Sequence, residues 1–288
     1  MDRRRCEGGV IVRRPFIAAA ALFLIGAVAL FWMYRIALAD PVIRRAEVVF
    51  PLAEGAAPVR VLLASDIHVA GPDMPPSRLE RLVGLMNAER PDLVVLAGDF
   101  VSDKTVATAR YSARAATAPL EGLRAPLGVF GVMGNHDYWR EDPGFEAALR
   151  AAGVAVLTNR SANAGPLTVV GIDDPHTRHA DVAEAFRAVP PGAATLVFSH
   201  SPDVIPSLPE TARLVLTGHT HCGQLVWPII GAITYATNTG ARYACGHIRE
   251  GARDIFVSAG LGTSILPLRL GAVPDIWLIT LHPKGEAR

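Results

Sequence analysis

Residues Leu127–Met133 (LGVFGVM) are followed directly by Gly134-Asn135-His136-Asp137, and this junction indicates how the chain folds. Seven mostly apolar residues predict a short buried strand. The four residues after it bring amide, imidazole and carboxylate side chains. Polar residues of these types at the end of a buried strand predict a loop at the sheet edge, where open α/β sheets bind their ligands.

The same pattern occurs four more times along the chain. Strand-like runs end in polar residues at Val59–Ser65 before Asp66-Ile67-His68, Asp92–Ala97 before Gly98-Asp99, Ala194–Phe198 before Ser199-His200, and Ala212–Leu216 before Thr217-Gly218-His219-Thr220-His221. Five of the nine histidines therefore lie at strand ends. Rigid strands fix where such loops begin, so we expect these side chains to converge on one site.

Helical patterns alternate with these strands, which predicts a layered α/β domain. Ser77 and Glu80 form a capping-box pattern before a helix that Pro91 ends. Further helices are expected at 106–118, 144–152 and 180–188. Residues 57–283 are interpreted as one domain, preceded at 40–56 by a linker and an edge strand over Arg44–Phe50.

An apolar segment precedes that domain. Phe16–Tyr34 contains no charged residue and has about the length that a membrane-spanning helix needs. Five arginines precede it, so its N-terminal side should remain in the cytoplasm and the domain should face outward. Residues 1–39 are thus either a membrane anchor or an export signal, because Arg13-Arg14 resembles a twin-arginine signal and Ala37-Leu38-Ala39 suits a signal peptidase.

Composition excludes several classes of protein. Half of the residues are hydrophobic and 19% are charged, which excludes intrinsic disorder. The formal net charge is +1, and residues 40–288 carry 22 basic and 25 acidic residues, so no nucleic-acid-binding field is expected. Cys222 and Cys245 could pair in an exported protein, but we expect unpaired thiols and a packing role for Cys222.

The ligand types select a class of metal. Carboxylate, amide and imidazole groups without thiolate suit Mn, Fe or Zn, and they are too numerous for one tetrahedral ion. Two metal ions are therefore predicted.

These five blocks, in this order, resemble the calcineurin-like metallophosphoesterases. Two further segments, Gly218–Gln224 and Gly260–Arg269, look like the bacterial branch that carries an N-terminal anchor or twin-arginine signal. The resemblance implies a β-sandwich of mixed sheets flanked by helices, here preceded by one transmembrane or signal helix. It also implies a phosphoester hydrolase.

Carried over residue by residue, the resemblance implies two ligand sets that share Asp99. The first comprises Asp66, His68, Asp99 and His221, and the second comprises Asp99, Asn135, His200 and His219. His136 is expected to stabilise or protonate the leaving oxygen, with Asp137 orienting its ring, or alternatively to serve as a structural residue beside the ligands.

The residues expected near the substrate each have two interpretations. Arg269 could contact a phosphate or pair on the surface, and Asp173 and Asp174 could line the pocket or form an ordinary turn. The expected function is hydrolysis of a phosphoester by a metal-bridging hydroxide at the outer face of the cytoplasmic membrane, or after export. The alternatives are a lipid-linked pyrophosphatase of the UDP-2,3-diacylglucosamine type and a non-catalytic metal-bearing scaffold.

Overall fold

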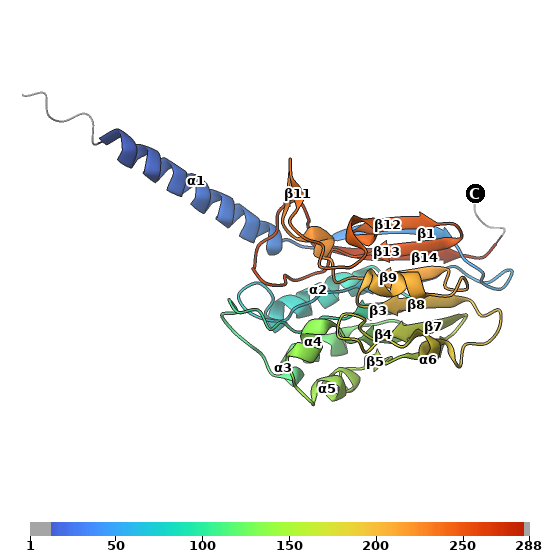
Figure 1. Cartoon of the computed structure of the whole chain (residues 1–288). Coiled ribbons are helices and arrows are strands. Elements are labelled where there is room, and N and C mark those ends of the chain that lie inside the picture. The colour runs from blue at the N-terminus through green and yellow to red at the C-terminus, as the bar shows by residue number, and fades with distance from the viewer. Residues whose placement is uncertain (1–12, 285–288) are drawn as a thin grey trace, which may run out of the picture.

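The computed structural model describes residues 13–284; the arginines and the cysteine of residues 1–12 lie outside that range. Helix α1 (Arg13–Ala37) extends away from the rest of the molecule (Figure 1). Its 25 residues correspond to about 38 Å at roughly 1.5 Å per residue. Residues Pro15–Ala37 are long and apolar enough to cross a membrane. Met33 and Ala37, in the last turns, are buried against the body.

The first of two six-stranded sheets contains the N-terminal half of the body and the last strand. Its order is β1 (Val42–Val49), β14 (Asp275–His282), β2 (Val59–Ala64), β3 (Leu93–Ala97), β4 (Val129–Val132) and β5 (Ala155–Val156). All neighbours pair in parallel except β14 and β2, which are antiparallel. The last strand of the chain, β14, therefore lies between β1 and β2.

The second sheet follows in the chain. Its order is β12 (Gly246–Glu250), β13 (Arg253–Val257), β9 (Leu214–Thr217), β8 (Thr195–Ser199), β7 (Leu167–Ile172) and β6 (Arg160–Ala164). The three inner pairs, β13 with β9, β9 with β8 and β8 with β7, are parallel, and the two outer pairs are antiparallel. A small hairpin, β10 (Val226–Trp227) with β11 (Gly231–Ala232), projects from this half (Figure 1).

Successive side chains of a strand point to opposite faces of the sheet, and this alternation explains how the two sheets pack. Val61 and Leu63 of β2 belong to the apolar layer between the sheets, together with Phe198 of β8. Leu62 and Ala64 point to the opposite face and join the cluster beneath the helices.

Helices cover the outer face of each sheet. The elements on the first sheet are α2 (Pro76–Ala88), α3 (Ala113–Thr117), η1 (Ala118–Gly122) and α5 (Phe145–Ala151), whereas α6 (Val182–Phe186) and η2 (Pro202–Ser207) cover the second. The short elements α4 (Asn135–Trp139), η3 (His221–Gly223) and η4 (Gly240–Tyr243) lie in connections. The predicted mixed sandwich flanked by helices is confirmed.

Two local predictions are wrong. The capping box is not formed, because α2 begins at Pro76 after Pro75, which places Ser77 inside the first turn. The helix expected over 106–118 is confined to α3. The segment before it is held as a loop by backbone hydrogen bonds to Gly71, one donated by Thr108 and one accepted by Ala109.

Candidate metal centre

The carboxyl ends of five strands meet at one edge where the two sheets face each other. Asp66 and His68 follow β2, Asp99 follows β3 and Asn135 follows β4, all from the first sheet. From the second sheet, His200 follows β8, while His219 and His221 follow β9. All seven side chains are buried, and they lie close together at this edge.

The side chains form two groups around Asp99. In one group, a ligand atom from each of Asp66, His68 and His221 lies within 4.8 Å of the others. In the other group, one ligand atom from each of Asp99, His200 and His219 also lies within 4.8 Å of the others. The Oδ2 atom of Asp99 lies 3.5 Å from His68 Nε2 and 3.2 Å from His200 Nε2. One carboxylate oxygen therefore faces both groups.

The spacing of the donor atoms fits metal ions. His68 Nε2 lies 3.0 Å from His221 Nε2, and His200 Nε2 lies 3.0 Å from both His219 Nδ1 and Asn135 Oδ1. Ring nitrogens bound to one cation at about 2.1 Å lie at a similar spacing. The other ring nitrogens of two of these histidines are occupied: His200 Nδ1 donates to the Ala97 carbonyl and His219 Nε2 to the Ala236 carbonyl. These bonds leave His200 Nε2 and His219 Nδ1 free for a cation.

Backbone conformation turns the ligands inward. Five of them have positive φ angles, between 48° and 69°: Asp66, His68, Asp99, His219 and His221. Non-glycine residues adopt this region rarely, and they do so most often at functional sites where surrounding structure holds them. Close approach also explains Gly218, because a Cβ there would lie 2.3 Å from Asp66 Oδ2. A Cβ at Gly134 would be equally close to Asp99 Oδ1.

Burial controls the charge of most of these ligands. It raises the pKa of Asp66 to about 6 and lowers the pKa of His219 to about 4. It also lowers the pKa of His68 and His221 well below the usual range. At Asp99 burial alone would raise the pKa, but the positive charges of neighbouring histidines, above all His200, outweigh burial and keep the pKa well below its ordinary value. Near neutral pH, His68, His219 and His221 are therefore neutral and can offer ring nitrogens to a cation, whereas the charge of Asp99 outweighs burial at His200 and raises its pKa well above the usual value.

His136 lies beside the ligands with a partner that the sequence did not predict. Its Nδ1 is hydrogen-bonded to Asp103, and its Nε2 lies 3.3 Å from Ser264 Oγ. Its ring packs edge-on against His68, 4.8 Å between centroids. The prediction that Asp137 orients this ring is wrong, because the Asp137 carboxylate is buried and accepts hydrogen bonds from two backbone amides, those of Val101 and Gly134.

Both alternatives for Arg269 are also wrong. The side chain is fully buried, and its guanidinium donates to the carbonyls of Ala259, Gly260 and Gly262. It neither pairs on the surface nor reaches the pocket. It also donates to the Ala272 carbonyl at 3.3 Å, and its Nη2 lies 3.4 Å from Nδ1 of His221. Its role is to hold together the backbone of residues 259–272, because one guanidinium can donate to several carbonyls that face the same point.

The Asp173-Asp174 turn lies behind the pocket rather than in its lining. Asp173 accepts from Tyr138 Oη at 2.7 Å, and Asp174 accepts from Thr177 within the turn. The turn interpretation is therefore correct. His176, the last residue of the same turn, does line the pocket, and its ring centroid lies 5.2 Å from that of His219.

Cys222 and Cys245 form a disulfide, which corrects the expectation of unpaired thiols. The bond ties the residue directly after His221 to the start of β12. The intervening segment leaves the body to form the β10–β11 hairpin and then returns, so its two ends lie close together in the fold. Spacing along the chain could not indicate this proximity.

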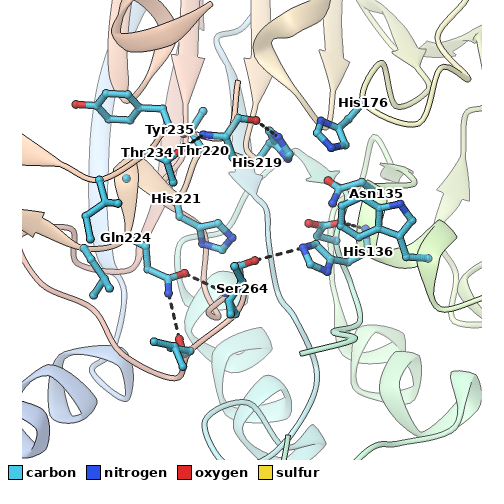
Figure 2. A pocket seen from close by; sticks show the side chains of 18 residues that line it. Asn135, His136, His176, His219, Thr220, His221, Gln224, Thr234, Tyr235 and Ser264 are labelled. Atoms are coloured by element: carbon cyan, nitrogen blue, oxygen red, sulfur yellow. Dashed lines mark hydrogen bonds between the residues drawn. The ribbon is translucent and has the colours of Figure 1, made fainter. Parts of the chain in front are cut away.

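A pocket of about 370 Å³ opens onto the metal centre. Asp99, Asn135, His136, His219 and His221 form its floor. Its walls are mainly apolar and are built from the following residues: Trp139, Leu225, Ile233, Tyr235, Ile265 and Leu266. Figure 2 shows His136, His219 and His221 facing the same space, with Ser264 between His136 and Gln224.

Comparison with known proteins places the chain in a family. Residues 59–223 match the family profile of the calcineurin-like phosphoesterases. An uncharacterized metallophosphoesterase of Aquifex aeolicus is 31% identical over 237 residues, covering 79% of this chain and 87% of that protein.

Two further relatives match most of this chain. The metallophosphoesterase YkuE of Bacillus subtilis is 28% identical over 211 residues, which cover 70% of this chain and 72% of YkuE. A transmembrane protein with a metallophosphoesterase domain from Danio rerio is 29% identical over 281 residues. That match covers 91% of this chain but only 62% of the fish protein's length. The chain belongs to the calcineurin-like phosphoesterase family and is a metallophosphoesterase.

Proposed function

We propose that this metallophosphoesterase hydrolyses its phosphoester at a centre of two metal ions. One ion would be held by Asp66, His68, Asp99 and His221, and the other by Asp99, Asn135, His200 and His219. The observation that carries this proposal is the position of Asp99 Oδ2, within 3.5 Å of a histidine nitrogen from each group. A carboxylate with that placement can bridge two cations, which dinuclear hydrolases hold about 3.5–4 Å apart.

The protein's own residues position substrate and proton around this centre. Divalent ions of the Mn, Fe or Zn type would attract the anionic phosphoryl group and lower the pKa of the attacking water. His136 faces the pocket through Nε2 and can donate a proton to the leaving oxygen. Asp103 accepts from Nδ1 and fixes the orientation of the ring.

An assay of the full-length protein would test this proposal. We expect about two metal ions per chain by elemental analysis, and hydrolysis of an aryl phosphate or a bis-aryl phosphate that excess chelator abolishes. His219→Gln should lower both the metal content and the activity. The matched control is His282→Gln, because His282 pairs with Glu47 at the opposite end of β14. Full activity in chelator, or one ion per chain, would contradict the proposal.

We further propose that residues 1–39 anchor the protein in the cytoplasmic membrane, with residues 57–283 forming the catalytic domain on its outer face and residues 40–56 joining the two. Two observations support this orientation. Arginines precede the apolar helix, and positive charge stays on the cytoplasmic side. The Cys222–Cys245 disulfide suits an oxidising compartment outside the cytoplasm. A periplasmic reporter fused at the C-terminus should be active, whereas an active cytoplasmic reporter would reverse the orientation.

A second candidate reaction is hydrolysis of a lipid-linked pyrophosphate. The apolar pocket wall favours it, because Trp139, Leu225 and Ile265 offer a surface for an alkyl group beside the metal centre. Comparing an aryl phosphate with a lipid pyrophosphate in the same preparation would separate the two reactions.

A further inference from the structure

Helix α1 joins the body at the edge that carries the metal centre. Val42, the first residue of β1, pairs with Asp275 of β14. Two residues further along β14, Trp277 pairs with Leu63 of β2. The start of β1 is therefore level with the end of β2, immediately before Asp66. Because α1 ends at Ala37, five residues before β1 begins, the anchor and the metal ligands share one edge of the molecule.

The residues at the end of α1 indicate where the membrane surface lies. Trp32 is 64% exposed, and Tyr34 is half-buried. Tryptophan and tyrosine gather at the boundary between lipid headgroups and acyl chains. Between them, the carbonyl of Met33 accepts a hydrogen bond of 3.1 Å from the Arg269 amide. If α1 spans the bilayer, the loop that precedes Arg269 lies at the level of the headgroups.

That loop and the neighbouring hairpin expose large apolar side chains. Ile265 in the loop is 70% exposed, and Ile229 and Ile230 at the hairpin tip are 97% and 77% exposed. The two segments are joined, because the Val226 amide donates to the Leu270 carbonyl at 2.7 Å. Figure 1 shows the hairpin projecting from the same end of the molecule as α1.

Neither segment contains a charged residue. Residues 225–236 (LVWPIIGAITYA) and 261–268 (LGTSILPL) are uncharged throughout. Surface loops in water normally carry charges, whereas a continuous apolar patch on a surface marks a contact with another molecule or a membrane. We call this patch the apolar rim; its members are Trp227, Ile229, Ile230, Ile233, Ile265 and Leu266.

We propose that the apolar rim inserts into the outer headgroup layer of the same bilayer that α1 spans. The proposal rests on the proposed anchoring by α1 and commits to a lipid surface as the partner, because the rim continues the helix–membrane contact. Two contact points, the helix and the rim, would restrict how the body tilts. Uncharged segments with isoleucine, leucine and tryptophan are the kind that lie in this layer.

The rim also forms part of the pocket mouth. Ile233, Ile265 and Leu266 line the pocket that leads to the metal centre. With the rim in the headgroup layer, the pocket opens at the depth where the phosphates of membrane lipids lie. A phosphoester held in the membrane surface could then enter it without leaving the bilayer.

Site-specific fluorescence would test this contact in the full-length protein. The Cys6→Ser background removes the thiol outside the disulfide. NBD dye is attached to Ile230→Cys or Ile265→Cys, and the proteins are placed in phosphatidylcholine–phosphatidylglycerol nanodiscs containing a nitroxide-labelled lipid. Leu24→Cys in α1 reports the anchor, and Glu54→Cys reports the opposite edge, where β1 ends and β2 begins.

We expect the NBD fluorescence at residues 230 and 265 to be quenched at least half as strongly as that at residue 24. The fluorescence at residue 54 should be quenched little. Adding Ile229→Asp should halve quenching at residue 265 and leave residue 24 unchanged. Quenching at residue 24 without quenching at residues 230 and 265 would overturn the rim contact but leave the anchor standing. A second copy of the chain covering the rim would give this same pattern. No quenching at residue 24 would overturn the anchor and the rim contact together. Melting curves of each labelled protein establish that it is folded, and none of these readouts depends on catalysis.

Discussion

Asp103 and His136, 33 residues apart in the chain, are joined by a hydrogen bond at the His136 ring nitrogen that points away from the pocket. The carboxylate therefore sets the orientation of the histidine while the other ring nitrogen faces the pocket. Asp103 touches none of the groups that would react, so it is a positioning residue.

Replacing Asp103 should slow the release of poor leaving groups. We expect Asp103→Asn to lower kcat about 10- to 100-fold for an alkyl phosphate, because a misaligned His136 delivers its proton less often. For a nitrophenyl phosphate, whose leaving group needs no proton, the loss should be less than about 5-fold. Metal content should stay unchanged. A matched control is Asp142→Asn, because Asp142 is half-buried, lies outside the pocket lining and accepts a hydrogen bond from the Gly144 amide. Equal losses on both substrates would show that Asp103 acts through general structure.

The two ligand groups should lose metal separately. His221→Gln removes a ligand from the group with Asp66 and His68, and His200→Gln removes one from the group with His219. Each variant should retain about one ion per chain, whereas Asp99→Ala should retain less than one, because Asp99 faces both groups. Activity should fall at least about 10³-fold in all three, in keeping with the size of electrostatic stabilisation at such centres. Elemental analysis with single-turnover assays would measure this, and a His221→Gln variant that retained both ions would remove this residue from the ligand set.

The raised pKa of Asp137 predicts how the stability of the metal-free protein depends on pH. Burial, followed by the charge of Asp99, raises the pKa of Asp137 to about 8 from 3.8. A folded-state pKa above the unfolded value gives stability at low pH that is lost as pH rises through about 8. In chelator, stability should therefore fall by about 1 kcal/mol between pH 7 and 9, which lowers Tm by roughly 3 °C.

The variant Asp137→Asn tests the source of that pH dependence. His200 contributes in the same direction, because the charge of Asp99 outweighs burial and raises its pKa well above the usual value. The variant should therefore flatten the melting-temperature profile without abolishing its slope. A profile that stays as steep as that of the parent would assign the effect to His200 alone.

The disulfide should stabilise the segment that carries the hairpin. It closes a loop over a sequence separation of 23, for which the chain-entropy account gives about 3 kcal/mol. We expect Cys222→Ser with Cys245→Ser to lower Tm by about 6–12 °C, as measured by calorimetry. Adding reductant to the parent should reproduce the shift and should leave the double variant unaffected. A shift that reductant also produced in the double variant would have another origin.

Much of the fold and of the candidate ligand set follows from local sequence. Each ligand lies within a few residues of a strand whose apolar pattern is clear, and topology brings strand ends to one edge, so positions such as Asp66 and His200 could be predicted without coordinates. The contacts of Asp103 and Arg269 and the disulfide could not be predicted in this way, because they depend on how the loops cross above the sheets. Arg269 illustrates the difficulty: a charged residue in a loop normally faces water, yet here four backbone carbonyls replace that water.

The two ligand groups draw residues from both sheets of the sandwich, and His68 and His221, whose Nε2 atoms are 3.0 Å apart, are separated by 153 positions in the chain. An ion bound between them would therefore act as a removable cross-link between the two halves of the fold. It would favour the native state over the unfolded chain by closing a long loop, as a disulfide does. The same cations that attract substrate would thus also set how firmly the sandwich holds together, so metal scarcity would cost the cell folded protein as well as activity.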